Sequence, residues 1–204
     1  KEEVNDFICG PGFAPWQWMG NVTHYGGILP EWWYDRQKDL SNKINDKMRA
    51  FGSEPMLPGY FGMVPCDFKE KNPLSNPIDQ GLFWFSYKRP SILRHDDVMF
   101  KNVADAFYYT TKQHFGEAHY FSGDPFHEGG ITDGIDLGEY AKAMIDEMKK
   151  YNHNSIWFLQ GWCNNPKVDM LNAIDKRDVA VVDLVSDTTY ERSNFYGGYP
   201  FIYS

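Results

Sequence analysis

The stretch GDPFHEGG, residues 123 to 130, holds the side chains best suited to acid–base chemistry. Glu128 follows an apolar run and stands between His127 and two glycines, which leave room around it. A carboxyl group partly removed from water has a raised pKa and can donate a proton near neutral pH. Glu128 is therefore the sharpest candidate for a general acid. The same local pattern also fits an ordinary loop glutamate paired with a nearby cation.

Other roles can be weighed for the same stretch. Asp124 precedes Pro125, where an aspartate commonly forms a turn or a cap, and the sequence favours that role for it. A metal site of Asp124, His127 and Glu128 is disfavoured, because the other histidines show no recognised ligand spacing. GxSxG, P-loop and GxGxxG patterns do not occur in the sequence, so we expect no metal, nucleotide or other cofactor.

Aromatic residues make up 17% of the chain, and many fall near turns. They gather in four segments, APWQWMGN, PEWWYD, GLFWFSY and LQGWCNN. Sugar rings have apolar C–H faces that pack on indole rings, while their hydroxyls bind polar neighbours. Together with a glutamate at a strand end, these segments indicate a carbohydrate pocket. Core packing explains any single tryptophan at least as well.

The composition narrows the class of protein. A chain of 204 residues with 42% hydrophobic and 24% charged residues is typical of one globular domain or a large part of one. A net charge of −8 without a local basic cluster disfavours nucleic acid as a partner. Apolar runs long enough to cross a bilayer are absent from the sequence. The three cysteines are widely spaced and indicate neither a disulfide framework nor a zinc site.

Helix-like and strand-like patterns alternate along the chain. Helical periodicity predicts helices over 30–52, 96–116, 137–151 and 166–174, and apolar runs predict strands over 54–62, 118–124, 155–162, 179–185 and 199–204. The first helix is expected to bury an apolar stripe and to stop at Gly52; the stripe comprises Trp33, Leu40, Ile44, Met48 and Phe51. The second helix is expected to begin at a cap, Asp96 or Asp97, and to stop at Gly116.

This order predicts an α/β fold with a parallel sheet, because runs that are apolar at successive positions suit strands covered on both faces. We expect a (β/α)8 TIM-type barrel that is incomplete in this chain, with about five parallel strands, since such a barrel has eight strands and about 250 residues. Residues 1–204 are then the central part of a single catalytic domain. Residues 1–30 are expected to form an active-site loop and residues 64–95 a long surface loop. Reactive groups belong at the carboxyl ends of the strands.

Long motifs support a more specific resemblance. The run FICGPGFAPWQWMGNVTHYGGILPEWW is similar to a GPxFxxWxxMGN loop, MRAFGSEPMLPGYFGMVP to a helix-to-strand passage, and YFSGDPFHEGG to an acid-bearing strand. WFLQGW, VVDL and GGYPFIYS are similar to the three strands that follow. In all of these the chain resembles the α-N-acetylglucosaminidases of glycoside hydrolase family 89, over essentially its whole length and in order.

The resemblance implies a retaining exo-glycosidase that releases terminal α-linked N-acetylglucosamine from mucin-type glycans or heparan sulfate. Glu128 is implied as the general acid and then the base. The nucleophilic glutamate is expected beyond Ser204. Carried over position by position, the walls of the sugar pocket are Trp16, Met19, Trp84, Trp162 and Leu184, with His127 near a ring hydroxyl. Leu184, rather than Asp183, is implied to face the sugar.

The resemblance also implies partners and a location. The expected partners are glycans with terminal α-N-acetylglucosamine and the remainder of the same barrel domain, and the enzyme is expected to be secreted or periplasmic, or lysosomal in a eukaryote. A different interpretation is that the chain is a catalytically inactive carbohydrate-binding or structural fragment, because a second carboxylate and some strands are missing. Hydrolysis by the isolated chain would refute that interpretation.

Overall fold

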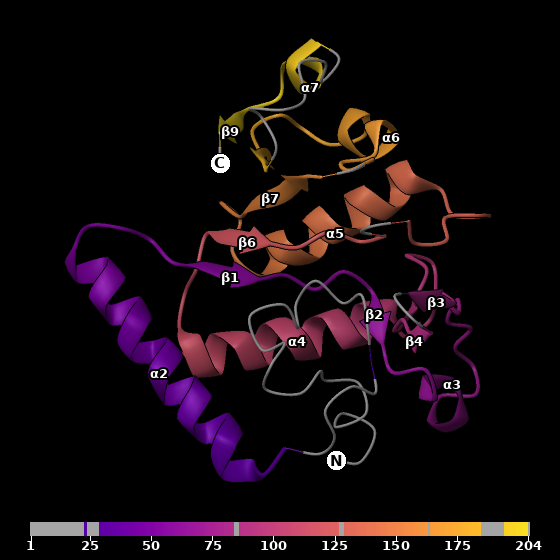
Figure 1. Ribbon diagram of the computed structural model, residues 1–204, viewed down its shortest axis with the longest axis horizontal. Coiled ribbons are helices and arrows are strands. Elements are labelled where there is room, and N and C mark those ends of the chain that lie inside the picture. The colour runs from indigo at the N-terminus through magenta and orange to yellow at the C-terminus, as the bar shows by residue number, and fades with distance from the viewer. Residues whose placement is uncertain are drawn as a thin grey trace.

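The computed structural model describes residues 23, 29–83, 86–126, 129–162, 164–184 and 194–203. Its main feature is a five-stranded sheet in the order β1-β6-β7-β8-β9. The strands are β1 Met56–Pro58, β6 Tyr120–Ser122, β7 Ile156–Gly161, β8 Val179–Asp183 and β9 Phe201–Tyr203. Every neighbouring pair is parallel. The carboxyl ends of all five strands therefore lie at one edge of the sheet (Figure 1).

Helices alternate with these strands along the chain (Figure 1). The long ones are α2 Glu31–Ala50, α4 Phe100–Phe115 and α5 Leu137–Tyr151, and the short ones are α3 Phe68–Lys71, α6 Val168–Asn172 and α7 Asn194–Gly198. Helix α4 packs against both α2 and α5, and α5 packs against α6. The predicted alternation and the parallel sheet are confirmed, and the architecture is a section of a (β/α)8 barrel. No helix within the described part of the chain has the length and apolarity needed to cross a membrane.

The hydrophobic core lies between the sheet and its helices. Phe121, Trp157 and Val179 stand in register on three neighbouring strands, and all three are buried. Tyr108 of α4 and Tyr151 of α5 meet Phe121 edge-on, with ring centroids 5.5 and 5.4 Å away. Aromatic side chains from two helices therefore fix the position of β6.

The opposite face of the sheet is less covered. Strands β1, β6 and β7 alternate between buried residues and residues that are exposed or half-buried. The expectation that strands are covered on both faces came from the runs of β7 and β8. Among the described residues, β8 is buried at four of its five positions, and β7 is buried on one face and half-buried on the other. The helices cover one face only, and in a closed barrel the other face points into the interior, where side chains of other strands fill the space.

Helix α2 forms where it was predicted, but only part of the predicted apolar stripe faces the protein. Trp33 and Met48 are half-buried, whereas Leu40 and Ile44 are each 50% exposed and Phe51 is 76% exposed. Asn45 is the buried residue of the helix, and the face turned toward the protein follows the helical spacing of Tyr34, Lys38, Ser41, Asn45 and Met48. The helix packs on α4, and its protein-facing side is mostly polar.

Helix α4 begins later than predicted. Its N-cap is Met99, which makes no side-chain capping bond. Asp97 instead accepts hydrogen bonds from the backbone N–H groups of Met99, at 2.9 Å, and Asn76, at 2.7 Å. The predicted aspartate cap is therefore wrong, because Asp97 is used to join the helix start to the preceding segment. The predicted stop at Gly116 is confirmed by its φ of 76° at the C-cap.

The segment over residues 64–95 contains short elements of its own. Strand β2 Met63–Val64 pairs antiparallel with β5 Ser91–Ile92, and β3 Leu82–Phe83 pairs antiparallel with β4 Tyr87–Lys88. In Figure 1, β3, β4 and α3 lie together beyond one end of α4, and β2 lies at that end. The sequence did not predict them, because strands of two residues leave no periodic pattern.

Candidate active site

The acid-bearing stretch begins where β6 ends, at the carboxyl edge of the sheet. The four residues that follow the strand, 123 to 126, are all buried. His127 and Glu128 lie outside the described residues, as do Trp16, Met19 and Trp84. The site is therefore built from the residues on each side of positions 127 and 128 and from the neighbouring strand ends.

Gly123 lets the chain leave β6 beneath two aromatic rings. Its carbonyl oxygen accepts a 2.8 Å hydrogen bond from the indole N–H of Trp157, whose ring stacks on Phe61 at 5.6 Å. Its φ is 141°, and a Cβ at this position would lie 1.9 Å from a ring carbon of Phe61. Only glycine fits here, so the first residue of GDPFHEGG is fixed by packing.

Phe126 and Gly130 bring together the two sides of positions 127 and 128. Phe126 is buried, has a φ of 60° and packs on Tyr140 of α5 with ring centroids 5.1 Å apart. Its carbonyl accepts the N–H of Gly130 at 3.3 Å. A Cβ on Gly130 would lie 2.6 Å from the Cα of Phe126, so this close approach also requires glycine.

Gln80 holds the chain just after the motif. Its side-chain oxygen accepts the N–H of Ile131 at 2.7 Å, and its side-chain nitrogen donates to the carbonyl of Ile131 at 3.2 Å. Gln80 is 4% exposed and belongs to the segment over residues 64–95. A side chain 51 positions away in sequence therefore clamps the backbone beyond Glu128.

Asp124 is the buried acid of the site. It is 4% exposed, and its two carboxyl oxygens lie 3.0 and 3.2 Å from the backbone nitrogen of Gln160 on β7, which donates to them. Burial raises the pKa of Asp124 to about 8, and the N–H of Gln160 offsets part of this rise. The predicted role as a turn former or cap is incomplete, since the side chain bonds to a strand 36 positions away.

Two of the predicted sugar contacts meet at the same edge. Trp162 directly follows β7 and Leu184 directly follows β8, and both are half-buried. The N–H of Leu184 donates to the carbonyl of Gly161 at 3.3 Å, which continues the register that pairs Gly161 with Asp183. Asp183, the last residue of β8, is buried, and Leu184 follows it just outside the strand.

Gln160 is a polar residue of the site that the sequence reasoning missed. Its side-chain oxygen is buried and has no hydrogen-bond partner among the described residues. A buried acceptor without a donor lowers the stability of the fold. Gln160 lies two positions before Trp162. The signal was present in the sequence, because Gln160 is the one polar side chain within the apolar run IWFLQG.

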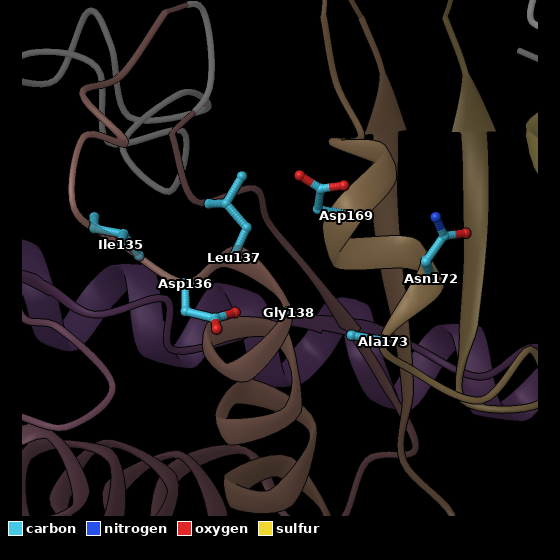
Figure 2. A pocket seen from close by; sticks show the side chains of 7 residues that line it. All are labelled: Ile135, Asp136, Leu137, Gly138, Asp169, Asn172 and Ala173. Carbon is cyan, nitrogen blue, oxygen red and sulfur yellow. The ribbon is translucent and has the colours of Figure 1, made fainter.

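A separate hollow of about 430 Å³ lies between the start of α5 and α6 (Figure 2). Its described lining residues are Ile135, Asp136, Leu137, Gly138, Asp169, Asn172 and Ala173. Asp136 is the N-cap of α5, and its carboxylate accepts the N–H of Glu139 at 3.0 Å. Trp162 and Leu184 are not among these residues. Within the described ranges there is also no cluster of three or more His, Cys, Asp and Glu side chains that could hold a metal.

The fold and the position of these groups define a class, the (β/α)8 barrels whose chemistry lies at the carboxyl ends of the strands. The family model of the α-N-acetylglucosaminidase (NAGLU) TIM-barrel domain matches residues 1–204, and the chain belongs to this family. The resemblance inferred from the sequence motifs is thereby confirmed.

Individual relatives agree with this assignment. Human α-N-acetylglucosaminidase is 29% identical over 219 residues, covering 100% of this chain and 30% of that protein. A family 89 glycoside hydrolase from Clostridium perfringens in complex with PUGNAc superimposes with a TM-score of 0.87 at 38% identity, covering 92% of this chain and 22% of that one. A form of the clostridial enzyme with two Glu→Gln substitutions, in complex with its substrate GlcNAc-α-1,4-galactose, is 37% identical, with the same TM-score and coverage. The chain thus spans less than a third of the length of these relatives.

Proposed function

We propose that the protein containing this chain is an exo-acting α-N-acetylglucosaminidase that hydrolyses terminal α-linked N-acetylglucosamine from glycans. Family membership over residues 1–204 supports this, as do the names of the human and clostridial relatives. The substrate in the clostridial complex, GlcNAc-α-1,4-galactose, is of the same chemical class. Mucin-type glycans and heparan sulfate are the proposed natural substrates, and the proposed location is extracellular, periplasmic or lysosomal.

One structural observation carries the proposal for this chain. The segment that bears Glu128 leaves the carboxyl end of β6 and is held on both sides, by buried Phe126 before it and by the Gln80 clamp on Ile131 after it. Trp162 and Leu184 end the next two strands at the same edge. A proton donor carried by this segment would work beside an indole and an aliphatic side chain, which suit the apolar face of a sugar.

The proposed mechanism retains the configuration of the sugar. Glu128 donates its proton to the glycosidic oxygen as that bond breaks, while a second carboxylate attacks the anomeric carbon and forms a glycosyl-enzyme ester. The Glu128 carboxylate then takes a proton from water, which hydrolyses the ester and frees the second carboxylate. The second carboxylate is proposed to lie beyond Ser204. The clostridial complex, in which two glutamates are replaced, supports a pair of glutamates.

The proposed pocket combines residues from several segments. Trp162 and Leu184 form part of its wall at the strand ends. Trp16, Met19 and Trp84 complete the wall, and His127 hydrogen-bonds a ring hydroxyl. These four assignments follow from the family resemblance.

The decisive experiment compares Glu128→Ala with the wild type in the complete protein, using aryl α-N-acetylglucosaminides with a phenyl or a 2,4-dinitrophenyl leaving group. We expect kcat/KM to fall by about 10²-fold or more with the phenyl glycoside, because general acid catalysis is worth about 10²–10⁴-fold. A much smaller loss of kcat/KM is expected with the dinitrophenyl glycoside, because 2,4-dinitrophenolate departs without needing a proton. Glu70→Ala, on exposed helix α3, is the matched control. Wild-type turnover of both substrates by Glu128→Ala would remove Glu128 from this role.

A second candidate function, a sugar-binding or structural fragment, has one observation in its favour. The sheet among the described residues has five strands, whereas a closed barrel of this type has eight. Calorimetry and activity assays on the isolated chain separate the two. Binding of N-acetylglucosamine without hydrolysis would support the fragment, and hydrolysis by the chain alone would refute it.

A further inference from the structure

Asp124 has an unusual combination of position and environment. It is the second residue after β6 and lies four positions before Glu128. It is 4% exposed, and its neighbours Gly123, Pro125 and Phe126 are also buried. Burial of a carboxyl group costs free energy unless hydrogen bonds compensate for the lost hydration. The position therefore requires an explanation beyond turn formation.

The hydrogen bond of Asp124 joins two strand ends. Both of its carboxyl oxygens face the N–H of Gln160, at 3.0 and 3.2 Å. The regular ladder between β6 and β7 ends nearby, at the bond from the N–H of Gly123 to the carbonyl of Phe158 at 3.4 Å. The Asp124 side chain thus extends the connection to β7 by one step after the backbone of β6 has left the sheet. Figure 1 shows β6 and β7 side by side at this point.

The two residues that follow Asp124 have little freedom to absorb a displacement. Pro125 has a fixed φ, and the ring of Phe126 is held against Tyr140 at 5.1 Å. A shift of Asp124 would therefore move Phe126, the last described residue before the acid-bearing positions. Acid catalysis is sensitive to such shifts, since a misplacement of about 1 Å can cost about 10²-fold in rate.

We propose that Asp124 is a positioning residue that fixes the start of the Glu128 segment to β7 through the N–H of Gln160 and so sets where the Glu128 carboxyl meets the glycosidic oxygen. This inference rests on the proposed function. Asp124 itself does not touch the reacting atoms. Because burial raises its pKa to about 8, Asp124 is mostly uncharged at neutral pH. An uncharged amide oxygen can therefore replace its carboxyl group as the acceptor.

The test compares Asp124→Asn and Asp124→Ala, in the complete protein, with the same phenyl and dinitrophenyl glycosides. Asp124→Ala removes the acceptor, and we expect it to lower kcat/KM by about 10²-fold for the phenyl glycoside and by less than about 10-fold for the dinitrophenyl glycoside. Asp124→Asn keeps a neutral acceptor for the N–H of Gln160, and both of its values should stay within about threefold of wild type. Equal losses on the two substrates, or an Asn variant as impaired as the Ala variant, overturn the proposal.

Two additions keep the outcome unambiguous. If Asp124→Ala does not fold by circular dichroism, Asp124→Ser takes its place, because its hydroxyl is too short to reach Gln160, and the same selective loss is expected. Glu128→Ala is measured in parallel. A selective loss in Glu128→Ala with a uniform loss in Asp124→Ala refutes only the role of Asp124. A uniform effect in Glu128→Ala refutes the general-acid role of Glu128, and a wild-type protein that hydrolyses neither glycoside refutes the proposed function itself.

Discussion

The two ends of strand β6 treat acidic side chains in opposite ways. At the amino end, the Glu54 carboxylate before β1 contacts the His119 ring nitrogen before β6, with 35% and 42% of the two side chains exposed. At the carboxyl end, Asp124 is buried and its hydrogen-bond partner among the described residues is a backbone N–H. One end pairs a carboxylate with a side chain at the surface, and the other removes the carboxyl group from water.

The contrast extends along the amino edge of the sheet. Lys149 pairs with Asp178 just before β8, and Arg177 pairs with Asp175 in the same turn. The Arg177–Asp175 pair is exposed, and exposed pairs contribute little each, whereas the Lys149–Asp178 pair is half-buried. The carboxyl edge instead depends on single buried contacts. This difference agrees with the general division of such barrels into a stabilising face and a functional face.

Among substitutions at the two edges of the sheet, Gly123→Ala is expected to have the largest effect on stability. Its Cβ would lie 1.9 Å from the Phe61 ring, so the aromatic stack under the carboxyl edge must move. We expect a loss of several kcal/mol in the free energy of unfolding, because overpacking and backbone strain add up at about 1–3 kcal/mol each. Gly52→Ala is the control near the amino edge. Gly52 also has a positive φ, but no atom lies within 4 Å of an added Cβ. The substitution should therefore lower the free energy of unfolding by about 1–2 kcal/mol. Equal urea midpoints for the two variants would contradict the prediction.

The pH dependence of stability sharpens the contrast. Because burial raises the pKa of Asp124 from about 4 to about 8, the folded state binds more protons than the unfolded state between these values. The free energy of unfolding should therefore fall as the pH rises through this window, by up to about 1.4 kcal/mol per pH unit. Asp124→Asn cannot titrate, so its stability relative to wild type should increase from pH 5 to pH 8. Urea unfolding at several pH values checks this, and parallel curves for the two proteins would contradict it.

A smaller effect is expected from Gln80→Ala, which removes both hydrogen bonds to Ile131. Loss of a buried hydrogen-bond partner costs about 1–3 kcal/mol. Hydrogen exchange of the Ile131 amide should become faster while the amides of β7 keep their protection. Gln80→Glu keeps the acceptor for the Ile131 N–H, and the exchange rate of the Ile131 amide in this variant should lie between those of the wild type and Gln80→Ala. Unchanged exchange at Ile131 in Gln80→Ala would show that the clamp does not hold the segment.

The smallest effect is expected at the amino edge. Glu54→Gln alters the contact with His119, and both side chains remain hydrated. We expect a change of about 0–1 kcal/mol in stability and no change in kcat/KM. Thermal unfolding and the phenyl glycoside assay measure the two quantities. A large loss of activity would show that the amino edge is not separate from the function of the carboxyl edge.

The elements with clear local signals were predicted from the sequence. Helix α5 has the predicted bounds, because its periodicity is strong and Asp136 caps its start. Strands β7 and β8 lie within the predicted runs for a similar reason, since apolar runs bounded by polar turns are unambiguous. Gly116 ended α4 as expected. These features depend on neighbours within a few positions.

The features that the sequence did not reveal depend on distant partners. The role of Asp124 requires Gln160, 36 positions away, and the clamp on Ile131 requires Gln80, 51 positions away. The buried face of α2 was predicted only in part, because its contact with α4 buries Asn45 and leaves Leu40 and Ile44 exposed. Trp162 and Leu184 were placed at strand ends from sequence, and the register of β7 and β8 brings those positions together. Their roles, and that of Glu128, stay predictions.

Gln80 connects the segment over residues 64–95 to a distant part of the chain. Its two hydrogen bonds to Ile131 link the segment with the two short antiparallel pairs to the stretch that carries the proposed proton donor. Changes of length or composition in this segment can therefore alter turnover without altering a single residue of the parallel sheet. Residues around Gln80 are therefore suitable targets for directed evolution, because they lie outside the parallel sheet. A library confined to them is expected to yield variants with altered kcat and an intact barrel.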